Sequence, residues 1–235
     1  MMPVVVLSGG LATRLRPITE KVPKALIEVN GIPFVLHQLE LFRQYGIEQV
    51  HYCLGYLGEK VQEVIESSRN SRYIRITYSF DGDKLLGTGG AIRKALEKLP
   101  EVFFVTYGDS FLNIDYQSVE MFFLTNAKVS DGLMTIYNNG NKYDTSNVIF
   151  KNGKITVYSK KQRLPEMTFI DFGIGILRKS HFSSYPEGFN FDLSDIYEEL
   201  SVKGNLIGFE SFERFYEIGS LKGIDDLSCY LKKQL

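Results

Sequence analysis

The chain has 235 residues, of which 44% are hydrophobic and 23% are charged, and its formal net charge at pH 7 is −1. This balance excludes a global attraction to nucleic acid or to an anionic membrane, so any polyanion site has to be local. No apolar run approaches the roughly 20 residues of a membrane-spanning helix, and the N-terminus lacks the pattern of a signal peptide. The cysteines, Cys53 and Cys229, fit no metal spacing. We expect reduced thiols in a cytoplasmic protein that binds neither nucleic acid nor membranes.

The first half of the chain alternates between predicted strands and predicted helices. The strands are expected at residues 3–8, 48–54, 73–80 and 102–107, and the helices at residues 33–45, 57–67 and 90–99. This alternation is typical of right-handed βαβ crossovers and of a mostly parallel sheet. Ligands on such sheets bind beyond the carboxyl ends of the strands, so the residues after the first and fourth strands are candidates for a site.

The second half is richer in short strands. They are expected at residues 131–137, 146–150, 154–159 and 167–177. Asn152 and Gly153 form a dipeptide that is typical of a tight hairpin turn. A helix is expected at residues 192–200, with Asp192 or Ser194 as its cap, and a terminal helix at residues 221–231. Because no linker or repeat separates the halves, the sequence predicts a single α/β domain.

The segment LSGGLATRLRP, residues 7–17, follows the first strand with a glycine pair, Gly9 and Gly10. Bare backbone lets a ligand approach closely, and successive N–H groups can form an anion-binding nest. Arg14 adds a guanidinium whose geometry matches phosphate oxygens, and Lys24 follows. The loop matches neither the P-loop string nor the dinucleotide-binding fingerprint. Its residues leave two interpretations open, a phosphate cradle or a tight turn with solvated arginines.

Two further segments carry candidate chemistry. LGTGGAIRKAL, residues 86–96, places three glycines just before a predicted helix, where bare backbone suits a polar ligand. Asp109 follows Gly108 at the end of a buried strand, where a carboxylate is well placed for Mg²⁺, which takes one or two carboxylates plus substrate phosphates. An ordinary loop and a helix-capping aspartate are the alternatives.

The stretch from residue 9 to residue 40 resembles the N-terminal signature of sugar-1-phosphate nucleotidylyltransferases. In that family a G-G-x-G-T-R-L-x-P loop is followed at a short, fixed distance by P-K. The matching residues here are Thr13, Arg14, Leu15, Pro17, Pro23 and Lys24. The resemblance covers essentially the whole chain, although it weakens between residues 130 and 165. It is greatest to the short bacterial D-glycero-D-manno-heptose 1-phosphate guanylyltransferases.

The resemblance implies a fold and a division of labour. The implied fold is a single Rossmann-like nucleotide-binding domain, residues 1–235, with a mostly parallel central sheet and a β-rich sugar-binding extension. Residues up to about 125 would form the nucleotide-binding half, and residues from about 126 the sugar-phosphate half.

The resemblance also implies which residues contact the substrates. The implied nucleotide contacts are Leu7, Gly9, Gly10, Thr13, Arg14, Lys24, Asp81, Gly87, Thr88 and Gly89. The implied contacts with the sugar phosphate are Gly108, Asn147, Lys160 and Asp171. The implied Mg²⁺ ligands are Asp109 and Glu217. The implied catalytic residues are Arg14, Lys24, Asp109 and Lys160.

Four positions depart from the family pattern. Ala12 stands where glycine is usual, so the loop either keeps a negative φ there or forms a slightly altered triphosphate cradle. Glu217 replaces an aspartate, which moves the carboxylate by about a bond length. Ser159 replaces an acidic residue beside the implied sugar-phosphate lysine, and Asp171 stands where asparagine is frequent.

The implied reaction is nucleotidyl transfer that makes an NDP-sugar for surface polysaccharide synthesis. The phosphate of a sugar 1-phosphate attacks the α-phosphorus of a nucleoside triphosphate in line, and pyrophosphate leaves. Because the second pKa of such a phosphate is ~6, the attacking group is anionic near pH 7 without a general base. GTP is the expected nucleotide, and the family often forms dimers or tetramers, so a homodimer is expected.

Three alternatives stay open. The chain could be a thymidylyl-, uridylyl- or cytidylyltransferase that acts on another phosphorylated acceptor. It could be a non-catalytic regulatory subunit that binds nucleotide sugars, which Ala12 and Glu217 favour and the presence of Arg14, Lys24 and Asp109 opposes. A glycosyltransferase with a D-x-D metal motif is disfavoured, because the DGD string at residues 81–83 lies in a predicted turn.

Overall fold

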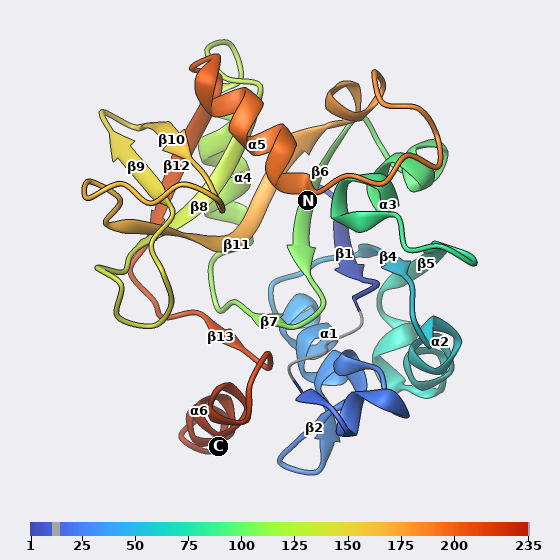
Figure 1. Cartoon of the computed structure of the whole chain (residues 1–235). Helices are drawn as coiled ribbons and strands as arrows, with labels where there is room; N and C mark the ends of the chain where they lie inside the picture. The colour runs from blue at the N-terminus through green and yellow to red at the C-terminus, as the bar shows by residue number, and fades with distance from the viewer. Residues whose placement is uncertain (11–14, 235) are drawn as a thin grey trace.

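The computed structural model describes residues 1–10 and 15–234 (Figure 1). Within these residues, a central sheet has nine strands in the order β5-β4-β1-β6-β11-β8-β12-β10-β9. The strands are β1 (Val4–Ser8), β4 (Gln49–Leu54), β5 (Arg75–Phe80), β6 (Val102–Tyr107), β8 (Gly132–Asn138), β9 (Val148–Lys151), β10 (Lys154–Tyr158), β11 (Phe169–Arg178) and β12 (Leu206–Ser211). Two short pairs lie outside this sheet, β2 (Glu28–Val29) with β3 (Ile32–Pro33) and β7 (Ser110–Phe111) with β13 (Tyr216–Glu217).

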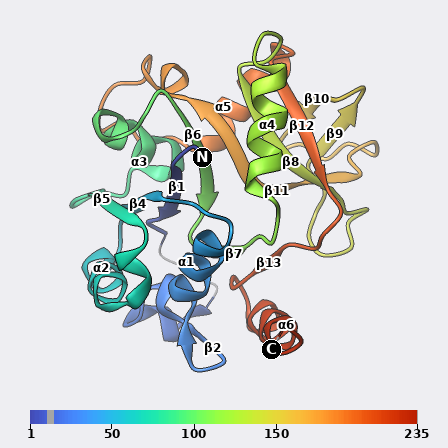
Figure 2. The ribbon, with the colours of Figure 1, turned by 180° about the vertical axis from the view of Figure 1, so that it is seen from behind.

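Helices cover both faces of the sheet (Figures 1 and 2). The α-helices of the described residues are α1 (Phe34–Gln44), α2 (Gly58–Ser67), α3 (Gly87–Ala95), α4 (Tyr116–Asn126), α5 (Leu193–Val202) and α6 (Leu221–Lys232). Helices α1, α2 and α4 contribute to the core on one face, whereas α3 and α5 contribute to the core on the other. Helix α6 packs against β2 and β13 in a third, smaller cluster. None of these helices is long and apolar enough to cross a membrane.

The middle of the sheet explains the composition of the first strand. β1 lies between β4 and β6 and is parallel to both. Its valines, Val4, Val5 and Val6, are fully buried, because layers of helix cover both sides of the strand. A strand that is buried on both faces needs no alternation of apolar and polar residues, which is why this segment is a continuous apolar run.

The expectation of a mostly parallel sheet is correct only for its first four strands. β5, β4, β1 and β6 are parallel, but β11 is antiparallel to both β6 and β8. In the β-rich half only β8 and β12 pair in parallel, and β9 pairs with both β10 and β11, so this half curls back on itself. The predicted hairpin turn is confirmed, since Asn152 and Gly153 have φ values of 52° and 79°. Such tight turns join antiparallel strands, whereas parallel strands need long crossovers.

Two helices differ from the sequence expectation. Helix α3 begins at Gly87, so the three glycines lie in its first turn and not before it. Helix α4 was not expected, because exposed apolar residues such as Met121 and Leu124 obscure its apolar stripe. Its N-cap, Asp115, accepts hydrogen bonds from two backbone N–H groups of the first turn. Asp192 caps α5 in the same way, which confirms one of the two predicted caps.

Candidate active site

A cavity of about 390 Å³ opens at the carboxyl ends of β1 and β6. The backbone joins these two strand ends, because the Gly108 N–H donates to the Leu7 carbonyl at 2.8 Å. Gly108 is required by this close approach, since a Cβ on it would lie 2.6 Å from the Ser8 Cβ. Parallel strands thus bring together residues that are far apart in the sequence, as expected at the edge of such a sheet.

Most of the implied nucleotide contacts line this cavity. The implied nucleotide contacts in its lining are Leu7, Gly9, Gly10, Lys24, Asp81, Gly87 and Thr88. The lining also contains Gly108, an implied sugar-phosphate contact, and Asp109, an implied metal ligand. Among the described residues, the implied site residues outside its lining are Gly89, Asn147, Lys160, Asp171 and Glu217. Thr13 and Arg14, and the departure at Ala12, lie outside the described residues. The lining includes residues that sequence reasoning missed, among them Cys53, Tyr56 and Tyr107.

The glycine-rich first turn of α3 is held by the protein itself. A Cβ on Gly89 would lie 2.3 Å from the Phe191 ring, so glycine is needed here for packing. The Gly89 and Gly90 N–H groups both donate to the Phe191 carbonyl, at 3.0 and 3.3 Å. Two backbone N–H groups in the first turn of α3 therefore already have a partner within the protein. Thr88 remains on the cavity side, and its hydroxyl oxygen accepts from the Leu193 N–H at 2.7 Å.

Asp81 supplies a buried carboxylate to the same wall. Its side chain accepts from the Leu86 N–H at 3.2 Å, and its backbone carbonyl accepts from the Lys94 ammonium at 3.0 Å. Burial raises the pKa of Asp81 above its usual range, although the Leu86 N–H and the Lys94 charge oppose this. Asp81, the first residue of the DGD string, thus forms part of the cavity wall, and the chain bends at residues 83 and 84.

Lys24 and Asp109 form an ion pair within the cavity. Lys24 is the first residue of a short 3-10 helix that follows Pro23, and Asp109 follows β6. The Ser110 hydroxyl donates to the second Asp109 oxygen at 3.3 Å. Gln38, a residue that the sequence analysis did not single out, fixes this turn by donating to the Tyr107 and Ser110 carbonyls at 2.9 and 3.0 Å. A cation and an anion are therefore held together in the cavity, at the two residues that the resemblance assigns to the reacting phosphates and the metal.

Glu217 lies beside Asp109 although it is distant in the sequence. In the β7–β13 pair Glu217 lies opposite Ser110, and the Ile218 N–H donates to the Asp109 carbonyl at 2.9 Å. Among the described residues, no group of three His, Cys, Asp or Glu side chains could hold a metal ion. The Asp109 carboxylate in the cavity fits a cation such as Mg²⁺, which takes one or two carboxylates and its remaining ligands from phosphate and water.

Comparison with known proteins identifies the family. The nucleotidyl transferase family model matches residues 3–173. The chain belongs to the nucleotidyl transferase family. This confirms the resemblance to sugar-1-phosphate nucleotidylyltransferases that the N-terminal signature suggested, and the chain is a nucleotidyltransferase.

Two relatives match over almost their whole length. Both are named D-glycero-alpha-D-manno-heptose 1-phosphate guanylyltransferase. The Campylobacter jejuni protein is 28% identical over 93% of this chain and 95% of its own. The Aneurinibacillus thermoaerophilus protein is 30% identical over 93% of each chain. The structure of HddC from Yersinia pseudotuberculosis with GMP-PN matches 98% of this chain and 100% of its own, with a TM-score of 0.80 at 22% identity, which supports the α/β fold.

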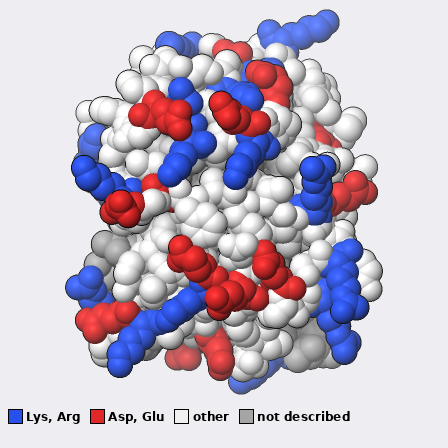
Figure 3. All heavy atoms as spheres, turned by 90° about the vertical axis from the view of Figure 1, so that its right-hand side faces the viewer, with Lys and Arg blue, Asp and Glu red and all other residues white. Residues whose placement is uncertain are grey.

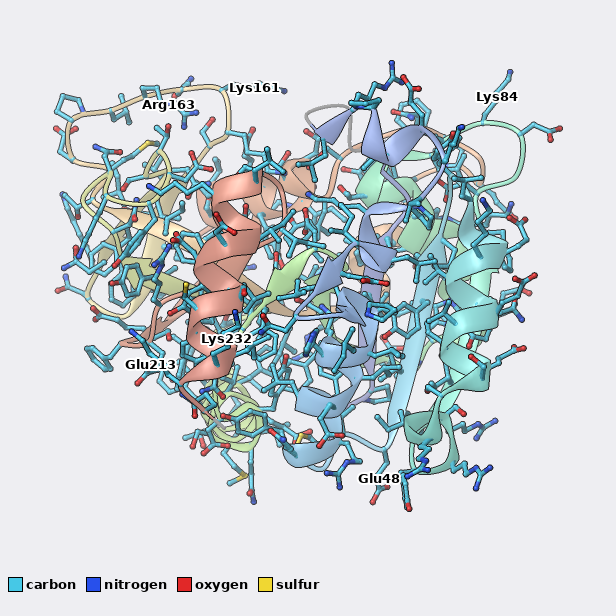
Figure 4. The ribbon with its side chains drawn as sticks, turned by 90° about the horizontal axis from the view of Figure 1, so that it is seen from below. Glu48, Lys84, Lys161, Arg163, Glu213 and Lys232 are labelled. Carbon is cyan, nitrogen blue, oxygen red and sulfur yellow. The ribbon has the colours of Figure 1, made fainter. Side chains whose placement is uncertain are left out.

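The β-rich half of this nucleotidyl transferase adds a second polar cluster next to the cavity. The Lys160 ammonium donates to an Asp192 carboxylate oxygen at 3.1 Å and lies 6.0 Å from the centre of the Tyr107 ring. Because Tyr107 also lines the cavity, this cluster adjoins the cavity. The neighbouring Lys161 points away from the body of the molecule (Figure 4).

Asp171 belongs to the same cluster. Burial raises the pKa of its carboxyl group to about 6, although a hydrogen bond from the Gly173 N–H and the charge of Lys160 oppose this. The Asp171 N–H donates to the Asn147 side-chain oxygen at 3.0 Å, so that oxygen already has a backbone partner. Ser159, at the departure from the family pattern, accepts hydrogen bonds from the N–H groups of the next turn. These contacts fix the shape of the loop that carries Lys160.

Proposed function

We propose that the chain transfers GMP from GTP to a sugar 1-phosphate and releases pyrophosphate, with a heptose 1-phosphate as the acceptor. The observation that carries this proposal is the Lys24–Asp109 pair inside a cavity at the ends of β1 and β6. The names of two relatives, at 28% and 30% identity over most of the chain, support the choice of guanine and of heptose.

Within this proposal, one set of residues binds the nucleotide and another set binds the acceptor sugar phosphate. Lys24 binds the reacting phosphates, and Arg14 binds the β- and γ-phosphates. Lys160 binds the phosphate of the acceptor, and Asp171 accepts hydrogen bonds from sugar hydroxyls. The acceptor phosphate is anionic near pH 7, so the protein positions the two phosphates and offsets their charge without removing a proton.

Asp109 and Glu217 would hold Mg²⁺. The bound ion would neutralise charge on the transferring phosphoryl group. The pairing of Lys24 with Asp109 supports this arrangement. When substrate binds, Lys24 would exchange Asp109 for a substrate phosphate, and Asp109 would exchange Lys24 for the metal. A homodimer and a cytoplasmic location remain predictions from the sequence.

A matrix of nucleoside triphosphates and sugar 1-phosphates, with pyrophosphate release as the readout, tests the proposal. We expect turnover that depends on Mg²⁺ and is fastest with GTP and a heptose 1-phosphate. Faster turnover with another nucleotide or acceptor would contradict the substrate assignment. No turnover with any pair would contradict the proposed catalysis and favour a non-catalytic, nucleotide-sugar-binding role.

A further inference from the structure

Asp192 connects the polar cluster of the β-rich half to the cavity. Its carboxylate accepts from the Lys160 ammonium at 3.1 Å. The same ammonium lies 6.0 Å from the centre of the Tyr107 ring, and Tyr107 lines the cavity. The sequence analysis singled out Asp192 only as a helix cap. The lysine that the resemblance assigns to the sugar phosphate is thus held by a residue to which the resemblance assigns no role.

The residues on both sides of Asp192 bond to the first turn of α3. The Phe191 carbonyl accepts from two N–H groups of that turn, at 3.0 and 3.3 Å. The Leu193 N–H donates to the Thr88 hydroxyl oxygen at 2.7 Å. Figure 1 shows the segment before α5 crossing the start of α3. Because this turn contributes Thr88 to the cavity wall, these bonds fix the position of Asp192 relative to the cavity.

The structural role of Asp192 does not require its charge. As the N-cap of α5, its side chain accepts from the Ser194 N–H at 2.8 Å. Serine and asparagine cap helices about as well as aspartate, so the cap needs an oxygen but no charge. The side chains of Lys160 and Asp192 are 43% and 47% exposed, and ion pairs at such exposure contribute little to stability. The ion pair therefore calls for a role other than stabilising the fold.

The residue before Lys160 is engaged elsewhere. The Ser159 hydroxyl donates to a Glu198 carboxylate oxygen at 3.1 Å, and its oxygen accepts from the N–H groups of the next turn. These contacts fix the backbone of the loop, whereas the Asp192 carboxylate fixes the end of the Lys160 side chain. A lysine side chain loses rotamer freedom when it binds a ligand. A partner that already restrains the ammonium group lowers this entropic cost of binding.

We propose that Asp192 is a positioning residue for the acceptor: its carboxylate holds the Lys160 ammonium beside the cavity, where the acceptor phosphate has to meet the nucleotide. This inference rests on the proposed nucleotidyltransferase function and adds a residue that acts through Lys160. An ammonium group has three hydrogens, so the contact with Asp192 leaves two that can donate to a phosphate. Residues 191–193 thus bond both to the helix that borders the nucleotide and to the lysine that binds the acceptor.

Steady-state kinetics with GTP and D-glycero-α-D-manno-heptose 1-phosphate test the inference, with pyrophosphate release as the readout. Asp192→Asn keeps an oxygen for the Ser194 N–H and removes the charge. It should raise the KM for the sugar 1-phosphate roughly three- to tenfold and leave the KM for GTP and the midpoint of urea unfolding nearly unchanged. Asp195→Asn is the matched control. Asp195 lies in the same first turn of α5, and its carboxylate accepts from the Asp192 N–H, a contact that asparagine keeps, so both KM values should stay unchanged.

A double-mutant cycle distinguishes positioning from an independent effect. If Asp192 acts through Lys160, Asp192→Asn should add nothing to the rise in KM that Lys160→Gln causes. Additive effects would overturn the inference, and so would a lower KM for the sugar 1-phosphate in Asp192→Asn, which would show that the carboxylate repels the phosphate. Turnover with an unchanged KM in Asp192→Asn would overturn this inference alone. No turnover by the wild-type chain would contradict the proposed function and this inference with it.

Discussion

The two halves of the molecule present different chemistry to the shared site. At the ends of β1 and β6 the cavity lining includes Gly9, Gly10 and Gly108, which have no side chains. The neighbouring cluster of the β-rich half is bounded by side chains that already have partners in the protein. The Lys160 side chain bonds to the Asp192 side chain, and the Asn147 side-chain oxygen accepts from the Asp171 backbone N–H. We infer that glycines open the cavity to its ligand around the Lys24–Asp109 pair, whereas a network of polar contacts shapes the cluster of the β-rich half.

On one face of the molecule, the surface charges do not separate the halves in this way. On the face drawn in Figure 3, basic and acidic side chains are interspersed and are not segregated by sign. A mixed surface produces little long-range attraction for an anion. Selectivity for phosphate must then come from the groups inside the cavity, which makes those groups the first targets for substitution.

The largest effect is expected from the central ion pair. Lys24→Ala and Asp109→Asn should each lower kcat by at least about 100-fold, because both groups offset charge on the reacting phosphates. Pyrophosphate release measures the rate, and circular dichroism checks the fold. Lys21→Ala removes a cation from an exposed position of the same segment and should leave the rate unchanged. Near-wild-type rates in the Lys24 or Asp109 variant would remove the basis for assigning the reacting phosphates to this pair.

A smaller effect, confined to one substrate, is expected in the β-rich half. Lys160→Gln should raise the KM for the sugar 1-phosphate by roughly tenfold, because the variant loses one charged hydrogen bond to the acceptor phosphate. The KM for GTP should stay nearly unchanged, since Lys160 now bonds to Asp192 in the β-rich half and is not assigned to the nucleotide. Lys161→Gln is the control, because Lys161 is adjacent in sequence but points away from the molecule. An equal rise in both KM values would show that the two halves do not divide the substrates between them.

The same contrast explains what the sequence could predict. The strand ends at Gly9 and Asp109 were predictable because a buried apolar run, a turn and a polar residue follow one another locally. The capping of α3 by the Phe191 carbonyl could not be predicted, because this contact joins segments about a hundred residues apart and leaves no local pattern in the sequence. The antiparallel β11 in the centre of the sheet was missed for the same reason, because strand order is set by tertiary packing. Residues that line the cavity at the strand ends were thus easier to predict from the sequence than contacts between distant segments.

The halves should also differ in how pH affects their stability. Burial, with a smaller contribution from Lys98, lowers the pKa of His51 in β4 to about 4 from 6.5, and its ring nitrogens bond to Thr77 and Ser79. Below pH 6.5 the unfolded chain binds this proton first, so stability is lost as the pH falls toward 4, by about 3 kcal/mol in total. The raised pKa of Asp171 acts in the opposite direction, since stability is lost as the pH rises from 3.8 to about 6.

Urea unfolding between pH 4 and 7 separates the two contributions. In His51→Gln only the Asp171 contribution remains, so the free energy of unfolding should fall as the pH rises through this range. In Asp171→Asn only the His51 contribution remains, so the free energy of unfolding should rise with pH more steeply than in the wild-type chain. His37→Gln, at a histidine that bonds to the Val29 carbonyl, serves as the control for loss of an imidazole. Identical pH profiles for the wild-type chain and both variants would contradict the opposing roles.

The smallest effects should distinguish two uses of glycine. Gly153 has a φ of 79° in the hairpin of the β-rich half, so Gly153→Ala should cost about 1 kcal/mol of stability, measured by urea unfolding, without changing turnover. Gly10 lines the cavity, has no positive φ, and a Cβ there would meet no atom of the described residues within 4 Å. Gly10→Ala should therefore leave stability unchanged and raise the KM for GTP, because the added methyl group occupies space meant for the ligand. If Gly10→Ala instead destabilised the fold and spared the KM, backbone conformation would explain both glycines, and the open backbone of the nucleotide half would not be an adaptation to its substrate.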